Sequence, residues 1–171
     1  GYYGLATGSW KYWAGVWGVD YEWIKKQYAE GMMEKPGMTL SRWIDGVMYP
    51  NDVIDQGPNL RAMVYWGHAP NSQTRGKEMV EAMKKLDLLV VVDPYPSATA
   101  AMAAMVRKDG VYLLPAATQF ETSGSCTASN RSIQWRERVI SPLFESQTDD
   151  AIMLAFAKKF GFEKEFLGNV K

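Results

Sequence analysis

The stretch LLVVVDPYPSATAAMAAMVRKDGVYLLP, residues 88–115, decides the fold of this chain. It starts with a continuous apolar, β-branched run at 88–92, which is the pattern of a strand buried on both faces. The alanine-rich segment 97–108 follows, and it predicts a helix with Ser97 as its N-cap. After a turn at Asp109 and Gly110, residues 111–114 form a second apolar run. The order strand, helix, strand is typical of a parallel α/β sheet.

The residues before this stretch extend the same alternation. Residues 62–66 (AMVYW) form a short apolar run that stops at Gly67, and residues 77–86 carry an apolar stripe at helical spacing. Residues 62–114 therefore predict a βαβαβ unit. The fold class that follows is α/β, a Rossmann-like parallel sheet with an aromatic N-terminal extension and a C-terminal helix.

The flanking segments predict further helices. Residues 20–34 read as a helix with Asp20 as its N-cap, and Thr39 or Ser41 is placed to cap a second helix that runs through Met48. The pattern divides the chain into an N-terminal aromatic and helical extension, 1–60, and an α/β domain, 61–171.

The C-terminal third is mostly irregular in this interpretation. Residues 116–135 carry no clear period, so they predict loop with a short strand near 132–135. Thr148 is a candidate N-cap for a last helix that ends at Phe160, and Gly161 suits the position just after that helix.

Composition excludes several classes of function. Nineteen basic residues balance nineteen acidic ones, so no basic footprint for nucleic acid is present. No apolar run reaches the roughly 20 residues that span a bilayer. The single Cys126 and single His68 offer no disulfide and no clustered metal ligands. Because the first seventeen residues are crowded with Trp, Tyr and Gly, we expect a piece of a larger protein, without a signal-peptide pattern.

Ligands of open parallel sheets bind beyond the carboxyl ends of the strands. Three loops leave the predicted strands there, at 67–71, 93–97 and 115–121. Gly67 removes a Cβ where a phosphate or flat ring approaches. Asp93 can accept from a ribose hydroxyl or from the N–H edge of guanine, and the helix that begins at Ser97 adds free N–H groups.

Each of these residues also has an interpretation without a ligand. Asp93 before proline is a common turn and helix entry, and Gly67 with Pro70 suits a plain turn. His68 fits a hydrogen-bonded loop residue, and Cys126 a small side chain. No GxGxxG or GxxxxGK[ST] motif occurs. Pattern alone therefore indicates a nucleotide-binding α/β domain of unknown ligand.

Longer strings carry a family resemblance. The runs YWGHAPNSQTRG (65–76), KKLDLLVVVDPYPSATAAM (84–102) and VYLLPAATQFETSGSCTASNRSIQWRERV (111–139) resemble the large catalytic subunit of formate dehydrogenases. These enzymes belong to the molybdopterin oxidoreductases, and the similarity is strongest to the respiratory, membrane-linked type. The upstream run EKPGMTLSRWIDGV (34–47) is similar to the same subunit.

The resemblance implies a cofactor and partners. Such subunits bind two molybdopterin guanine dinucleotides around molybdenum or tungsten, and usually a [4Fe–4S] cluster, and they oxidise formate to carbon dioxide with transfer of two electrons. The metal ligand, the cluster cysteines and the catalytic residues would lie outside this chain, so the piece alone is expected to be inactive. The implied partners are the remainder of the catalytic subunit and an iron–sulfur electron-transfer subunit. A periplasmic complex is favoured, and a cytoplasmic one is the alternative.

The resemblance also implies which residues hold the cofactor. The first loop would run along the pterin dinucleotide, the second would hold its guanosine end, and the third would lie next to it. These residues are Gly67, His68, Pro70 and Asn71; Asp93 and Ser97; and Thr118, Gln119, Glu121 and Gly124. Two rival functions stay open, another molybdopterin oxidoreductase such as a nitrate or polysulfide reductase, and a stand-alone nucleotide-binding or interaction module without catalysis.

Overall fold

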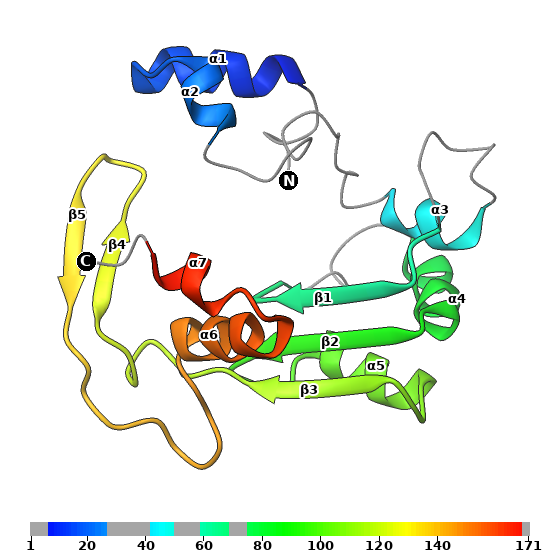
Figure 1. Cartoon of the computed structure of the whole chain (residues 1–171). Coiled ribbons are helices and arrows are strands. Elements are labelled where there is room, and N and C mark those ends of the chain that lie inside the picture. The colour runs from blue at the N-terminus through cyan, green and yellow to red at the C-terminus, as the bar shows by residue number, and fades with distance from the viewer. Residues whose placement is uncertain (1–6, 27–41, 50–58, 69–74, 169–171) are drawn as a thin grey trace. The chain divides into compact units, whose positions relative to one another are not determined.

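The computed structural model describes residues 7–26, 42–49, 59–68 and 75–168, and side chains from residue 11 onward. They fall into two compact units, Gly1–Ala62 with Pro70–Asp87 and Met63–Ala69 with Leu88–Lys171. Figure 1 labels the helices and strands. The helices are α1 Thr7–Trp17, α2 Tyr21–Lys25, α3 Trp43–Met48, α4 Gly76–Lys85, α5 Ala98–Val106, α6 Asp149–Phe160 and α7 Glu163–Leu167. The strands are β1 Ala62–Trp66, β2 Leu88–Asp93, β3 Val111–Pro115, β4 Gly124–Thr127 and β5 Ile133–Arg136.

The predicted βαβαβ order is confirmed. Strands β1, β2 and β3 form one parallel sheet in that order, so β2 lies in the middle. The register of β2 on β3 pairs Leu89 with Val111 and Asp93 with Pro115. Because both strands run the same way, their carboxyl ends meet at one edge, and Asp93 and Pro115 stand side by side there.

Strand β2 is buried on both faces, as its unbroken apolar sequence predicts. Val90 and Val92 pack with Ile152 of α6 on one face. The intervening Leu89 and Val91 point to the other face, where α5 contacts β2 and β3. Figure 1 shows α5 and α6 on opposite sides of the sheet. Burial of this strand between two helices supplies the apolar core of the second unit.

Helix α6 packs against the end of β1 through one hydrogen bond and one aromatic contact of Trp66. The indole Nε1 of Trp66 donates a hydrogen bond to Asp149 Oδ1 at 2.7 Å, and its ring lies 6.1 Å from the ring of Phe156. Phe156 in turn stacks on Phe160 at 5.9 Å. The predicted helix end is confirmed, since Gly161 follows Phe160 with φ +81°, a left-handed conformation that glycine adopts without strain.

Other predicted boundaries were partly right. Ser97 caps α5, with its Oγ accepting from Ala100 N at 3.3 Å, and Asp20 caps α2 by accepting from Trp23 N at 2.9 Å. Thr148 is the N-cap of α6, although its side chain makes no capping hydrogen bond. The helix predicted to reach residue 34 is described only through α2, and residues 27–34 lie outside the described part, as do Thr39 and Ser41.

The loop predicted at 116–135 was wrong in part. Residues 124–127 form strand β4, which pairs in antiparallel fashion with β5 and sets Ser125 opposite Trp135. The expected short strand near 132–135 is confirmed as β5, one residue later. Its partner was missed because GSCT is small and polar, and such a strand has little intrinsic propensity. Helices α1 and α7 were not predicted either.

In the first unit, an ion-pair network ties α3 to the start of α4. The carboxylate of Asp45 is buried and lies 2.7 Å from Arg75 Nη2 and 3.1 Å from Arg42 Nη1. Arg75 holds a left-handed φ of +69° and also pairs with Glu78. The hydrogen bond from Arg75 is the main influence that holds the pKa of Asp45 below its ordinary value, against the opposing effect of burial.

A first prediction concerns the core. Val92→Ala should lower the free energy of unfolding by about 2–3 kcal/mol, because it removes two buried methyl groups and leaves a cavity between β2 and α6. Urea unfolding of the protein measures the change. Met105→Ala is the control, since that side chain is 86% exposed and its loss should cost about 0.5 kcal/mol or less. Equal losses in the two variants would contradict a core centred on β2.

A second prediction concerns pH. Asp45→Asn should lower the unfolding free energy near neutral pH by about 1.5–3 kcal/mol, since it removes a charged acceptor from two arginines. Because the folded pKa of Asp45 is lowered, its stabilisation is complete above the unfolded pKa and is lost as pH falls through the folded one. Thermal melts of both proteins should therefore converge below about pH 4. A constant difference down to pH 2 would rule out the charge as the cause.

Candidate functional site

The loop after β2 is shaped by Asp93 itself. Asp93 Oδ1 accepts from the main-chain N–H of Tyr95 at 3.1 Å, which makes a tight turn at the end of the strand. The main-chain carbonyl of Tyr95 then accepts from Ser97 N at 2.7 Å, and Ser97 begins α5. The turn leads from the central strand directly into a helix N-terminus. Asp93 thus has the structural role that its position before proline indicated, and its half-buried carboxylate keeps a second oxygen, Oδ2, for other contacts.

The loop after β3 is fastened by a buried carboxylate. Glu121 is only 3% exposed, its Oε2 accepts from Thr118 N at 2.6 Å, and its Oε1 accepts from Leu143 N at 2.7 Å. These main-chain amides, with that of Thr118 first, hold the pKa of Glu121 below its ordinary value. The carboxylate therefore joins two segments that are 22 residues apart in the sequence.

A returning segment completes this end of the sheet. Gln147 N donates to the carbonyl of Pro115 at 3.1 Å, and Ala117 N donates to the carbonyl of Gln147 at 2.7 Å. Residues around Gln147 thus run parallel to the end of β3 on the side away from β2, with Ala116 as the bridge partner. Nothing in the local sequence pattern at 140–147 signals this pairing, because its partner lies some 30 residues earlier.

Two cavities open at the carboxyl ends of β2 and β3. One of about 340 Å³ lies against Asp93, Tyr95, Ala100 and Leu113. The other, of about 630 Å³, lies against Tyr95, Thr118, Phe120 and Glu121 and against the returning segment. They share Pro94, Tyr95, Pro115 and Glu145. Both sizes fall in the range of small-ligand sites, and both are at the edge that the topology rule selects.

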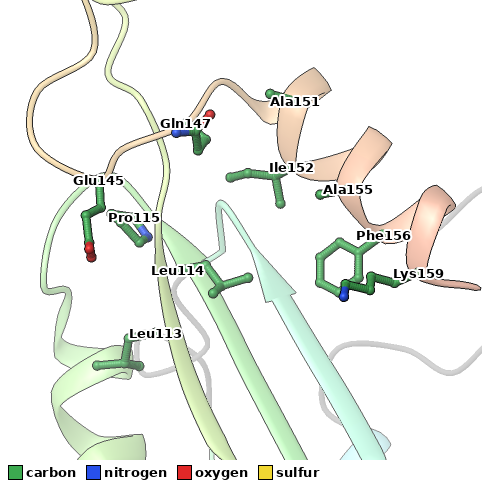
Figure 2. Close-up of a pocket in the computed structure, with 10 residues that line it drawn as sticks. All are labelled: Leu113, Leu114, Pro115, Glu145, Gln147, Ala151, Ile152, Ala155, Phe156 and Lys159. Carbon is green, nitrogen blue, oxygen red and sulfur yellow. The ribbon is translucent and has the colours of Figure 1, made fainter.

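A third cavity, of about 540 Å³, lies between β3 and α6. Figure 2 shows Ile152 and Phe156 of α6 beside Leu114, while Leu113 points to the other side of the strand. Its walls are mainly aliphatic and aromatic, with Lys159 at one end. Glu145 and Gln147 are its other polar residues, and it does not reach Asp93 or Thr118, so it lies apart from the predicted site residues.

The loop after β1 is described only at its start. Gly67 N donates to the carbonyl of Val92 at 3.0 Å, so this loop begins beside the end of β2. Gly67 is exposed with φ +56°, and a Cβ there would meet no other atom within 4 Å. The Nε2 atom of His68 is buried and has no hydrogen-bond partner in the described part of the chain. The open space at Gly67 leaves its backbone accessible to a ligand, whereas His68 Nε2 has no exposed surface.

The predicted site residues divide into three sets. The structure brings Gly67 and Asp93 together at the strand ends, and Thr118 and Glu121 share a cavity with the Asp93 loop. Ser97 and Gln119 lie in the same loops but do not line the described cavities, and Gly124 lies in the β4–β5 hairpin. Pro70 and Asn71 lie outside the described residues. Tyr95 was missed as a site residue, although an aromatic between two prolines at a strand end was visible in the sequence.

The described residues lack two further features. In residues 7–26, 42–49, 59–68 and 75–168, no three or more His, Cys, Asp or Glu side chains are grouped so as to hold a metal ion. In the same ranges, no helix is long and apolar enough to cross a bilayer. Cys126 is exposed on β4.

The α/β unit belongs to the Rossmann-like class of folds, in which ligands bind beyond the carboxyl ends of the strands, and its cavities open at that edge. Within that class, a family model described as molybdopterin oxidoreductase matches residues 24–159. This chain therefore belongs to the molybdopterin oxidoreductase family.

Proteins similar to this chain are named for different activities. The chain is 32% identical over 138 residues to a trimethylamine-N-oxide reductase of Vibrio cholerae, which covers 74% of this chain and 16% of that protein. It is 30% identical over 122 residues to an F420-dependent formate dehydrogenase subunit alpha of Methanocaldococcus jannaschii, covering 71% and 17%. The chain thus spans about a sixth of the length of these relatives.

A solved structure supports the fold. The acetylene hydratase from Pelobacter acetylenicus superposes with a TM-score of 0.57 at 14% sequence identity. The match covers 85% of this chain and 19% of that one. At this identity the likeness concerns the fold alone.

The Glu121 contacts lead to a third prediction. Glu121→Gln should lower the melting temperature by a few degrees near neutral pH, because an amide NH₂ would face a main-chain N–H that now donates to a carboxylate. Since the folded pKa of Glu121 is lowered, this difference should shrink as pH falls through that pKa. Differential scanning calorimetry at several pH values measures it. Glu165→Gln on exposed α7 is the matched control and should melt as the unchanged protein does.

Proposed function

We propose that this chain supplies part of the binding site for a molybdopterin guanine dinucleotide within a larger oxidoreductase subunit. The observation that carries the proposal is the position of Asp93, at the end of the central strand and on the wall of a cavity. A carboxylate is the side chain that accepts from both N1–H and the 2-amino group of guanine, or from ribose hydroxyls. Membership of the molybdopterin oxidoreductase family supports the cofactor class.

The residues fit the nucleoside end of such a cofactor. Asp93 Oδ1 accepts from the Tyr95 amide, which orients the carboxylate, and Oδ2 together with the remaining lone pair of Oδ1 is proposed to accept from the two N–H groups of guanine. Gly67 leaves the backbone open to approach, and His68 is proposed to lie along the same path. Ser97 starts α5, whose N-terminal amides favour a negative group. Thr118, Gln119, Glu121 and Gly124, with Pro70 and Asn71, are proposed to line the rest of the path.

In this proposal the chain positions the cofactor and does not carry out the reaction. When bound, the molybdenum or tungsten of the cofactor supplies two-electron redox chemistry. This chain orients the dinucleotide, excludes water from one side of it and supplies hydrogen-bond partners for its polar groups. The metal ligand and any iron–sulfur cluster are proposed to belong to other segments of the subunit.

For the whole protein we propose formate oxidation to carbon dioxide, in a complex with an iron–sulfur electron-transfer subunit and with the periplasm as its location. Support comes from the resemblance of residues 65–76 and 111–139 to formate dehydrogenases and from the 30% identity to the Methanocaldococcus subunit. A second candidate is reduction of trimethylamine N-oxide, which the 32% identity to the Vibrio enzyme favours.

A fourth prediction tests the nucleotide site. Asp93→Asn in the full-length subunit should weaken cofactor retention by about 1–3 kcal/mol, because an amide replaces the charged acceptor while the turn to Tyr95 is kept. Molybdenum or tungsten and guanosine are measured per mole of purified protein. Asp109→Asn, in the exposed turn before β3, is the matched control. Full metal and guanosine content in Asp93→Asn would refute the role of Asp93.

Two assays on the full-length protein decide between the reactions. Formate-dependent reduction of an artificial dye would support the dehydrogenase. If the protein oxidises a reduced viologen dye only when trimethylamine N-oxide is added, and shows no activity with formate, the second candidate replaces the formate dehydrogenase. Metal-loaded protein with neither activity would overturn both.

A further inference from the structure

Tyr95 is an exposed aromatic on a rigid support. Its side chain is 64% exposed, although burial of an aromatic ring is strongly favoured. Pro94 and Pro96 flank it, and each fixes its own backbone φ. Its main-chain N–H and carbonyl are both used, by Asp93 Oδ1 at 3.1 Å and by Ser97 N at 2.7 Å. The exposed Tyr95 side chain is therefore attached to a backbone whose conformational freedom is already restricted.

Tyr95 lines both strand-end cavities. Tyr95 contributes to the wall of the cavity of about 340 Å³ that contains Asp93, and to the wall of the cavity of about 630 Å³ that contains Thr118. It thus stands at their shared wall, two residues from the carboxylate. An exposed aromatic face next to a fixed acceptor offers the two contacts that a purine base needs, one for its face and one for its edge.

We propose that the ring of Tyr95 is the stacking platform for the guanine base whose edge Asp93 receives. This inference rests on the proposed function and adds a binding residue to that site. In this proposal Tyr95 and Asp93 have different roles. Stacking is tolerant of base identity, because every base has a π face, whereas the carboxylate distinguishes guanine by its N–H groups.

The rigid turn at Tyr95 lowers the entropic cost of stacking a base on its ring. A flexible aromatic loses rotational and backbone freedom when it stacks, and that loss reduces affinity. Here the two prolines and two hydrogen bonds have already removed the backbone freedom in the folded protein. The stacking contact should therefore depend on the ring and not on the phenolic hydroxyl, which makes Tyr95→Phe a conservative variant and Tyr95→Ala a disruptive one.

The experiment uses the full-length subunit, prepared without cofactor and checked by its thermal melt to be folded. Dissociation constants are measured calorimetrically for GDP, for IDP, which lacks the 2-amino group, and for ADP, whose N1 is an acceptor. Variants are Tyr95→Phe, Tyr95→Ala, Asp93→Asn and the control Tyr112→Ala. Tyr112 is 57% exposed, comparable to Tyr95, but is outside both cavities. Guanosine retained by the cofactor-loaded variants is a second readout.

Stacking predicts a specific pattern. Tyr95→Ala should weaken GDP and IDP binding by the same factor, about tenfold or more, and leave their ratio unchanged. Tyr95→Phe and Tyr112→Ala should stay within about twofold of the unchanged subunit. Asp93→Asn should instead reduce the preference for GDP over IDP and ADP. Cofactor-loaded Tyr95→Ala should retain less guanosine than Tyr112→Ala does.

Failure of the platform is distinguishable from failure of the site. If Asp93→Asn abolishes guanine preference while Tyr95→Ala binds GDP normally, the platform is refuted and the site stands. If Tyr95→Phe loses as much affinity as Tyr95→Ala, the hydroxyl and not the ring face makes the contact, and stacking is overturned. If the unchanged, folded subunit shows no preference for GDP over ADP, the proposed guanosine site fails, and the platform fails with it.

Discussion

Burial of β2 on both faces is the constraint on which the sheet-bearing unit depends. Val90 and Val92 meet α6, while Leu89 and Val91 occupy the face contacted by α5. A parallel strand in this position has to be covered on both sides, since its apolar side chains alternate between them. That requirement places β2 in the middle of the sheet and delivers Asp93 to the edge where ligands of such sheets bind.

The polar groups at this edge have structural roles, and these roles decide which of them is available to a ligand. One oxygen of Asp93 closes the turn to Tyr95, and both oxygens of Glu121 hold main-chain amides of separate segments. A carboxylate with its lone pairs so committed shapes the walls of a cavity and has less capacity left for a ligand. Asp93 is therefore better suited to contact a nucleoside directly, and Glu121 to keep the third loop in position beside it.

The family relationship explains why the chain alone does not specify a reaction. Relatives at 32% and 30% identity are named for reduction of trimethylamine N-oxide and for formate oxidation, and this chain spans about a sixth of each. On the proposed function, this segment binds the nucleoside end of a shared cofactor, a task that is the same in either enzyme. Substrate choice arises where the substrate meets the metal, and a common fold does not determine it.

The sequence by itself determined the sheet, because the short apolar runs LLVVV at 88–92 and VYLL at 111–114 flank an alanine-rich helical segment, which is the chain order of a parallel α/β unit. It also determined the strand-end position of Asp93 and the capping of α5 by Ser97, which are local consequences of chain order. Tertiary structure alone decided the β4–β5 hairpin, the pairing of Gln147 beside β3 and the hydrogen bond from Leu143 N to Glu121 Oε1. These contacts join small or polar residues far apart in the chain, so no local periodicity encodes them. The shared wall at Tyr95 belongs to the same group, since it exists only once two strand ends and the returning segment have met.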